Sequence, residues 1–187
     1  MQSAASREAT RERAPRAEHP RGARMIVVLM GVSGCGKSTV GAALAAALGW
    51  PLIEADDLHP PANVAKMAAG TPLTDEDRWP WLDRIVAVLR RACAEHDNVV
   101  LACSALKQAY RDRLARAGGM RFVHLRGDRE TIASRLAARR HRYMPATLLD
   151  SQFATLEPPR DAIDVDIRMS VDAQVRLIID VLRETAR

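Results

Sequence analysis

Aromatic residues are scarce in this 187-residue chain, at 4% of its length, and its three cysteines form no CxxC pair and no paired Cys/His spacing. That cysteine pattern argues against a disulfide framework and against a structural zinc site, and it suits a reducing compartment. No uninterrupted apolar run approaches the roughly 18 to 20 residues needed to cross a bilayer. We therefore expect a cytoplasmic protein without a membrane partner.

Excess positive charge is also small once the first 24 residues are set aside. The net charge is +5, but residues 1–24 hold six arginines against three glutamates, which leaves +2 for the other 163 residues. Such a balance, with few aromatic side chains to stack on bases, argues against a nucleic-acid partner. Residues 1–24 are expected to be a disordered tail, or an untranslated stretch if synthesis begins at Met25. Residues 25–187 then form one domain.

Short apolar runs alternate with segments of helical spacing throughout residues 25–187. The run MIVVLM at 25–30 is typical of a strand covered on both faces. Strands are predicted at 25–30, 51–53, 98–103, 121–125 and 162–167. Helices are predicted at 37–48, 61–69, 79–94, 107–117, 129–140, 146–156 and 171–184. This alternation predicts a three-layer α/β/α fold with a five-stranded parallel sheet, and a ligand at the carboxyl ends of the strands.

The stretch GVSGCGKS at residues 31–38 matches the phosphate-binding pattern G-x-x-x-x-G-K-[ST] in full. It lies between a predicted strand and a predicted helix, where backbone N–H groups and the helix N-terminus can surround an anion. Lys37 is expected to reach the β- and γ-phosphates of a nucleoside triphosphate as a catalytic residue, and the Ser38 hydroxyl to coordinate Mg²⁺. The predicted ATP site comprises Gly31, Val32, Ser33, Gly34, Cys35, Gly36, Lys37, Ser38 and Thr39.

Three acids crowd the end of the second predicted strand, at Glu54, Asp56 and Asp57. Carboxylates this close repel one another unless a cation, a proton in transit or solvent separates them. In a doubly wound fold this strand end lies beside the phosphate loop, where a carboxylate can accept the proton of an attacking hydroxyl. We interpret Asp56 as catalytic, and Asp57 as a helix cap or a solvated residue.

Four stretches together resemble the gluconokinase family: GVSGCGKST, DDLHPPANVAKMAAGTPLTDEDRWPWL, ACSALKQAYRDRL and MPATLLDSQFATLEPP. The likeness runs from about Met25 to the C-terminus, and the block from Asp56 to Leu82 is far more specific than the phosphate loop. The resemblance implies a P-loop kinase fold similar to nucleoside monophosphate kinases, with a helical substrate cap and a lid. It also implies ATP and Mg²⁺ as cofactors, D-gluconate as the substrate phosphorylated at its 6-hydroxyl, and a homodimer.

The resemblance further assigns roles by position in the first half of the chain. Asp56 would be the general base, or the partner of a Mg²⁺-bound water, that activates the 6-hydroxyl. Residues 59–78 would form the cap over the sugar acid, with His59, Lys66 and Arg78 as candidates for substrate binding. An anionic substrate needs at least one cation there, preferably a bidentate arginine. A solvated surface position is the alternative for each cation.

The second half of the chain would complete the site. Ser104 and Lys107, after the third predicted strand, would face the same cleft as their family counterparts, with a helix cap as the alternative for Ser104. A basic lid would bring positive charge to the transferring phosphoryl group and contact ATP. Its candidate residues are Arg135 and Arg139, followed by Arg140 and Arg142.

The chain departs from the family pattern at two places. Glu54-Ala55-Asp56 stands where the family usually has Asp-Gly-Asp, and Arg142 precedes Tyr143 where the family tends to have histidine. The first change keeps the second acid, and the second leaves a positive charge in the lid. Neither change alters the phosphate loop.

Two other activities are alternatives. A kinase for shikimate or a nucleoside monophosphate would share the phosphate loop, but CSAL stands where shikimate kinases have a Gly-Gly-Gly run. A nucleotide-dependent switch would bind RNA through the arginine-rich tail. Against that alternative, the strand VVLAC ends without the acid of a Walker B strand.

Overall fold

The computed structural model describes residues 24–96, 98–137 and 149–185. Five parallel strands form one sheet in the order β2-β3-β1-β4-β5. Their bounds are β1 Met25–Met30, β2 Leu52–Glu54, β3 Val99–Ala102, β4 Gly119–Arg126 and β5 Ile163–Asp166. The prediction of a five-stranded parallel sheet is therefore confirmed.

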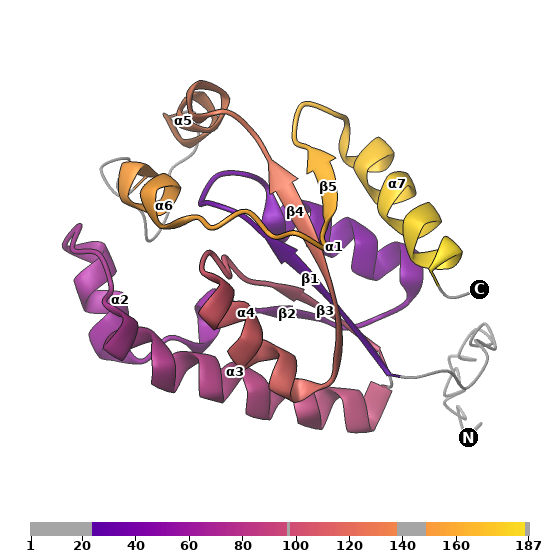
Figure 1. Ribbon diagram of the computed structural model, residues 1–187, viewed down its shortest axis with the longest axis horizontal. Coiled ribbons are helices and arrows are strands. Elements are labelled where there is room, and N and C mark those ends of the chain that lie inside the picture. The colour runs from indigo at the N-terminus through magenta and orange to yellow at the C-terminus, as the bar shows by residue number, and fades with distance from the viewer. Residues whose placement is uncertain (1–23, 97, 138–148, 186–187) are drawn as a thin grey trace, which may run out of the picture.

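Helices cover both faces of the sheet and complete three layers (Figure 1). α1 Lys37–Leu48 and α7 Val171–Glu184 lie on one face, and α3 Asp75–His96 and α4 Gln108–Leu114 lie on the other. Three further helices, α2 Pro61–Ala68, α5 Arg129–Ala137 and α6 Leu149–Thr155, gather beyond the arrowheads of the strands in Figure 1. This end of the sheet is where the predicted site lies.

Alternate side chains of β1 belong to two separate hydrophobic cores. Val27 and Leu29 pack in the core that also contains α1 and α7. Ile26, Val28 and Met30 pack in the core that contains α3 and α4. All five side chains are at most 1% exposed. The central strand is thus held from both faces, and the loop that follows it starts from a rigid point.

The start of α3 differs from the prediction. The helix begins at Asp75, before the predicted start at residue 79, and Pro80 lies inside it. Its N-terminus is a reciprocal capping arrangement, since the Asp77 N–H donates to Thr74 Oγ1 at 3.3 Å and the Thr74 N–H donates to Asp77 Oδ2 at 2.9 Å. Those two bonds stabilise the first turn ahead of the proline.

Two short 3₁₀ helices complete the fold. η1 Ala55–Leu58, directly after β2, has no counterpart among the predicted elements, and η2 Ala115–Ala117 continues α4 over the range predicted as one helix. The other predicted boundaries agree with the structure to within two residues. The exceptions are residues 138–140 and 146–148, which lie outside the described residues, as does the predicted tail up to residue 23. Among the described helices, none is long and apolar enough to span a membrane.

Candidate active site

β1 runs directly into a loop whose shape depends on three glycines. Their φ angles are 135° at Gly31, 84° at Gly34 and 106° at Gly36, a region that residues with a Cβ rarely adopt. Space is short at Gly34 as well, because a Cβ there would lie 2.7 Å from Cγ of Leu136. The loop conformation therefore requires glycine at these positions.

Lys37 opens α1 directly after this loop. Its ammonium group donates to the carbonyl oxygens of Gly31 and Val32, at 3.0 Å each. The N–H groups in the first turn of an α-helix have no intrahelical acceptor, and among the described residues no side chain caps α1 at Gly36. The free N–H groups, the helix dipole and the ammonium group together favour an anion with several oxygens, such as the phosphates of a nucleotide.

Two distant segments hold the loop in place. The Ser33 N–H donates to Gln152 Oε1 of α6 at 2.6 Å, although 119 positions separate the two residues. The Gly31 N–H donates to the carbonyl oxygen of Ser104, just after β3, at 3.2 Å. The loop is thus hydrogen-bonded both to the segment after β3 and to α6.

The three acids after β2 lie at different depths. Glu54 is half-buried and accepts a hydrogen bond from the Ser38 hydroxyl at 3.1 Å. Burial raises the pKa of its carboxyl group above the ordinary value, and the charges of Asp56 and Asp57 raise it further, against the lowering effect of the Ser38 bond. Asp56 and Asp57 are exposed on η1. The result is a patch of negative potential next to the hydroxyl predicted to bind Mg²⁺.

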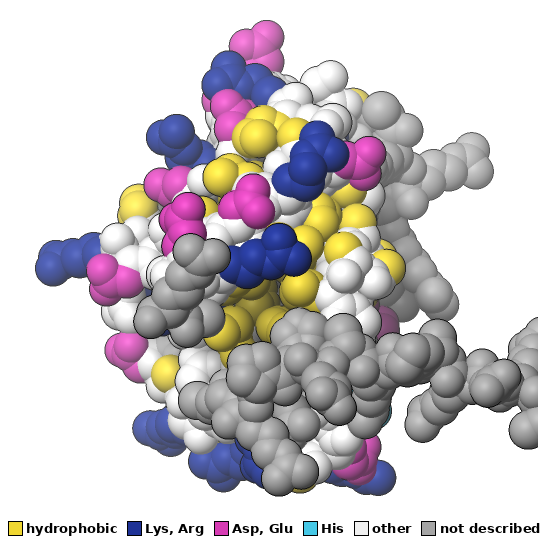
Figure 2. Space-filling model, turned by 90° about the vertical axis from the view of Figure 1, so that its right-hand side faces the viewer, with side chains coloured by type: hydrophobic (Ala, Val, Ile, Leu, Met, Phe, Trp, Pro, Cys, Tyr) yellow, Lys and Arg dark blue, Asp and Glu magenta, His cyan; other side chains and the backbone are white. Residues whose placement is uncertain are grey.

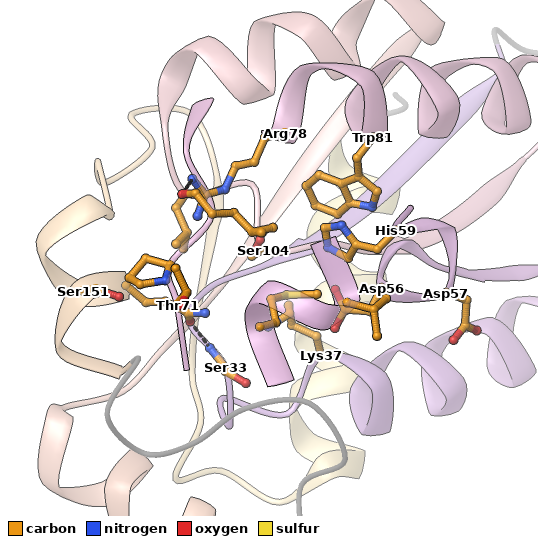
Figure 3. A pocket seen from close by; sticks show the side chains of 16 residues that line it. Ser33, Lys37, Asp56, Asp57, His59, Thr71, Arg78, Trp81, Ser104 and Ser151 are labelled. Carbon is orange, nitrogen blue, oxygen red and sulfur yellow. Dashed lines mark hydrogen bonds between the residues drawn. The ribbon is translucent and has the colours of Figure 1, made fainter. Parts of the chain in front are cut away.

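A pocket of about 210 Å³ lies beside this patch. Figure 3 shows Lys37 and Asp56 on one side of it and Arg78 on the other. The lining combines residues of the loop, η1, α2, α3 and α6. Six of the predicted site residues take part: Ser33, Lys37, Asp56, His59, Arg78 and Ser104.

His59 forms one wall of the pocket. Its ring stacks on the indole of Trp81, with the ring centroids 4.1 Å apart and an angle of 11° between the planes. Burial lowers the pKa of the imidazole from 6.5 to about 4, with Asp56 acting in the opposite direction and Arg78 in the same direction. His59 is therefore neutral at pH 7 and serves as a hydrogen-bonding group rather than a cation.

Arg78 brings a positive charge to the same pocket from the first turns of α3. Its Nη1 donates to the carbonyl oxygen of Leu73 and lies 3.4 Å from the Tyr110 hydroxyl. Its guanidinium carbon lies 5.5 Å from the centroid of the Tyr110 ring. These contacts hold the guanidinium group against the pocket wall.

Three other predicted cations take positions outside the lining. Lys66 pairs with Asp77 at 2.6 and 2.8 Å, and Lys107 pairs with Asp75 at 2.8 Å to each oxygen. Arg135 donates to the carbonyl oxygen of Ile167 at 2.7 Å. Arg139, with Arg140 and Arg142, lies outside the described residues. Direct contacts of these residues with ligands stay predictions.

Several lining residues carry no signal in the local sequence. Trp81 and Gln152 line the pocket, as do the apolar side chains of Val64, Met67 and Leu73. Each of them sits in a helix or loop whose pattern also fits an ordinary packing role. These residues lie within the stretches that resemble the family, but only the folded structure shows that they line the same pocket.

Comparisons with known proteins agree with this geometry. Residues 26–159 match the sequence model of the AAA domain family. The chain is 47% identical over 168 residues to a probable gluconokinase of Xenopus tropicalis, and the matched region covers 79% of this chain and 88% of the relative. It is 46% identical over 157 residues to the gluconokinase of Gluconobacter oxydans, and the matched region covers 83% of this chain and 88% of the relative.

Solved structures extend the comparison to the fold. A gluconokinase from Sinorhizobium meliloti 1021 superposes with a TM-score of 0.77 at 44% identity, covering 89% of this chain and 95% of that one. The APS kinase CysC of Mycobacterium tuberculosis, in complex with AMPPNP and APS, superposes with a TM-score of 0.62 at 18% identity, covering 85% of this chain and 97% of that one. The second likeness shows the shared fold alone.

Proposed function

The chain belongs to the gluconokinase family and has its ATP-dependent kinase activity, and we propose that it transfers the γ-phosphate of ATP to the 6-hydroxyl of D-gluconate. The products are 6-phospho-D-gluconate and ADP. One observation carries the proposal: a single pocket contains Lys37 of the phosphate loop, the carboxylate of Asp56 and the guanidinium group of Arg78. The pocket thus has a complementary group for each reacting part: Lys37 for the phosphate, Asp56 for the reacting hydroxyl and Arg78 for the substrate carboxylate.

The phosphates of ATP bind to the loop formed by residues 31–39. The N–H groups of the first turn of α1 and the ammonium group of Lys37 neutralise the charge on the β- and γ-phosphates. For this purpose the ammonium group leaves, or shares, its two carbonyl acceptors at Gly31 and Val32. Catalysis then rests mainly on position and on charge neutralisation.

The donors present fit Mg²⁺, a cation that prefers oxygen ligands. The Ser38 hydroxyl lies 3.1 Å from the Glu54 carboxylate, next to two further acids. Among the described residues no three His, Cys, Asp or Glu side chains are grouped to hold a metal by themselves. Ser38 would hold Mg²⁺ jointly with phosphate oxygens and water, and Glu54 would orient the Ser38 hydroxyl. Bound Mg²⁺ supplies positive charge to the phosphates.

Asp56 is the proposed general base. It lies on η1 with its side chain in the pocket, beside the phosphate loop. A carboxylate there accepts the proton of the 6-hydroxyl as the oxygen attacks the γ-phosphate. Arg78 would bind the carboxylate at the other end of the sugar acid, and His59 would bind its hydroxyls. Ser104 would add a further polar contact.

The charge on one face of the protein does not favour the RNA-binding alternative. On the face shown in Figure 2, Lys and Arg side chains are interspersed with Asp and Glu side chains. A nucleic-acid site usually requires positive charge concentrated on one surface. That face shows no such concentration, and the gluconokinase relatives favour a sugar acid as the substrate class.

The test is ATP-dependent phosphorylation by the purified full chain, offered gluconate, shikimate, glycerate and AMP separately. We expect release of ADP and formation of a 6-phosphate with gluconate alone. The Lys37→Met variant, which removes the ammonium group, controls for contaminating kinases and should be inactive. Turnover on another acceptor would overturn the substrate, and ATP hydrolysis without any acceptor effect would overturn the transfer reaction.

Three further properties are proposed. The family resemblance suggests a homodimer, which analytical ultracentrifugation would test. A cytoplasmic location fits the three cysteines, all of which are buried. Mass analysis of N-terminal peptides from the native protein would test whether residues 1–24 are translated.

A further inference from the structure

Asn63 is a buried polar residue of α2 that lies next to His59. Its side chain and backbone together are only 4% exposed. Its amide nitrogen Nδ2 donates to the carbonyl oxygen of Asp77 at 2.9 Å and lies 3.4 Å from Nδ1 of His59. Asn63 therefore joins the residue at the pocket wall to the first turn of α3.

These two contacts determine which nitrogen of His59 carries its proton. A backbone carbonyl only accepts hydrogen bonds, so the Asp77 contact identifies the amide end that points inward as NH₂. An NH₂ group only donates, so Nδ1 of His59 must be the acceptor and must be unprotonated. Because His59 is neutral, its one ring proton is then on Nε2.

The surroundings of His59 keep the ring neutral and fixed. One face stacks on Trp81, and Figure 3 shows the ring between Trp81 and Asp56. A protonated imidazole so near Asp56 would pair with the carboxylate and make it a weaker base. A neutral ring leaves Asp56 free to accept a proton, while its Nε2–H still donates one hydrogen bond.

We propose that Asn63 is a positioning residue that holds His59 in the Nε2–H form, and that this N–H donates to a hydroxyl oxygen of the sugar acid. A neutral N–H group matches a hydroxyl better than it matches the substrate carboxylate, because the negative charge of the carboxylate is paired with Arg78. The second half of the inference rests on the proposed gluconate site. The first half concerns the protein without substrate.

The tautomer is tested by NMR of the substrate-free full chain with ¹⁵N-labelled histidine. We expect the His59 ring to show the Nε2–H pattern at pH 7. Asn63→Asp keeps the size of the side chain but replaces the donor with an acceptor, and it should convert His59 to the Nδ1–H form or to the imidazolium. A wild-type ring protonated on Nδ1, or an even mixture, would overturn the assignment.

A pair of variants at His59 tests the donor without relying on Asn63. Glutamine places its amide nitrogen near the position of Nε2, whereas asparagine reaches only the position of Nδ1. We expect His59→Gln to lower kcat/KM for gluconate by about threefold and His59→Asn by at least about tenfold, with KM for ATP unchanged, since one hydrogen bond to substrate is at stake. Equal losses in the two variants would overturn the role of the Nε2–H.

The two parts of this test separate the inference from the proposed function. Wild-type protein with the Nε2–H tautomer but no turnover of gluconate would overturn the gluconate site, and with it the substrate contact. Turnover of gluconate with the opposite tautomer would overturn the role of Asn63 and leave the proposed function intact.

Discussion

The indole Nε1–H of Trp81 donates a hydrogen bond of 2.8 Å to the carbonyl oxygen of Ala55, the residue directly before Asp56. Trp81 is 3% exposed and Ala55 is fully buried. The bond therefore ties the proposed base to α3 through a buried contact, and the same indole supports His59 on its face. One side chain thus positions two groups of the pocket.

Trp81→Phe should remove this hydrogen bond while keeping an aromatic ring under His59. A buried carbonyl without its partner costs about 1–3 kcal/mol, so the free energy of unfolding in urea should fall by roughly that amount. We expect kcat for gluconate to fall about tenfold as Asp56 loses its fixed position. Trp79→Phe is the matched control, since Trp79 contacts Tyr110 edge-on outside the pocket and should leave kcat near its original value. An unchanged kcat in Trp81→Phe would contradict the positioning role.

Asp56→Asn should remove the base and keep the shape of the side chain. Loss of a general base typically lowers kcat by about 10²–10⁴-fold, and we expect a loss in that range with KM for ATP little changed. Asp57→Asn is the neighbouring comparison: Asp57 also lines the pocket, but Figure 3 shows its carboxylate pointing away from Lys37, so this variant should lose less than about tenfold. Equal losses in the two variants, measured by steady-state kinetics, would mean that general negative charge matters rather than a base at residue 56.

The fold could be predicted closely because its signals are local. The run at β1 is continuously apolar, and the loop after it is a contiguous motif. The start of α3 was misplaced because the prediction followed the helical spacing of apolar residues, which begins at Trp79, while the actual cap is the pair Thr74 and Asp77. η1 is only four residues long and shows no periodicity, so its helical conformation was not predicted, although its residue Asp56 was predicted to belong to the site.

The site was predictable only in part because charge pairing depends on tertiary contacts. Lys66 and Arg78 look equivalent in sequence as cations for a carboxylate. In the structure Lys66 pairs with Asp77 at 2.6 Å outside the lining, whereas Arg78 lines the pocket and lies 4.0 Å from its nearest acidic partner, Asp75. Gln152 illustrates the opposite case, a residue without a charge that contacts the phosphate loop from far along the chain.

This difference between the two cations leads to a direct comparison. Arg78→Gln should raise KM for gluconate at least about tenfold, because a charged hydrogen bond to a carboxylate is typically worth about 1.5–3 kcal/mol. Lys66→Gln should change KM less than about threefold, since its exposed pair with Asp77 contributes little. Thermal unfolding of both variants checks that the fold is retained. A large KM effect in Lys66→Gln alone would show that Lys66 turns into the pocket when substrate binds.

Gly34→Ala should weaken ATP binding through the shape of the loop. An alanine at residue 34 would have to adopt a φ angle of 84°, and its Cβ would lie 2.7 Å from Cγ of Leu136, so both backbone strain and overpacking oppose the substitution. Each effect typically costs about 1–3 kcal/mol. Gly49→Ala is the control, because its φ angle of 67° is also positive but nothing lies within 4 Å of the new Cβ. Calorimetric titration with ATP should show the loss for Gly34→Ala alone.

His59 should make the stability of the protein depend on pH. Its pKa is about 4 in the folded chain and 6.5 in the ordinary, unfolded case, so between these values the unfolded state binds the additional proton. Acid therefore favours unfolding: the stabilisation from the neutral ring is complete above pH 6.5 and is lost as the pH falls toward about 4. Urea unfolding of wild type and His59→Gln at several pH values over this range isolates the effect, since the other titrating groups are shared. Wild type should lose more stability than the variant as the pH falls, and parallel curves would mean that the imidazole titrates alike in both states.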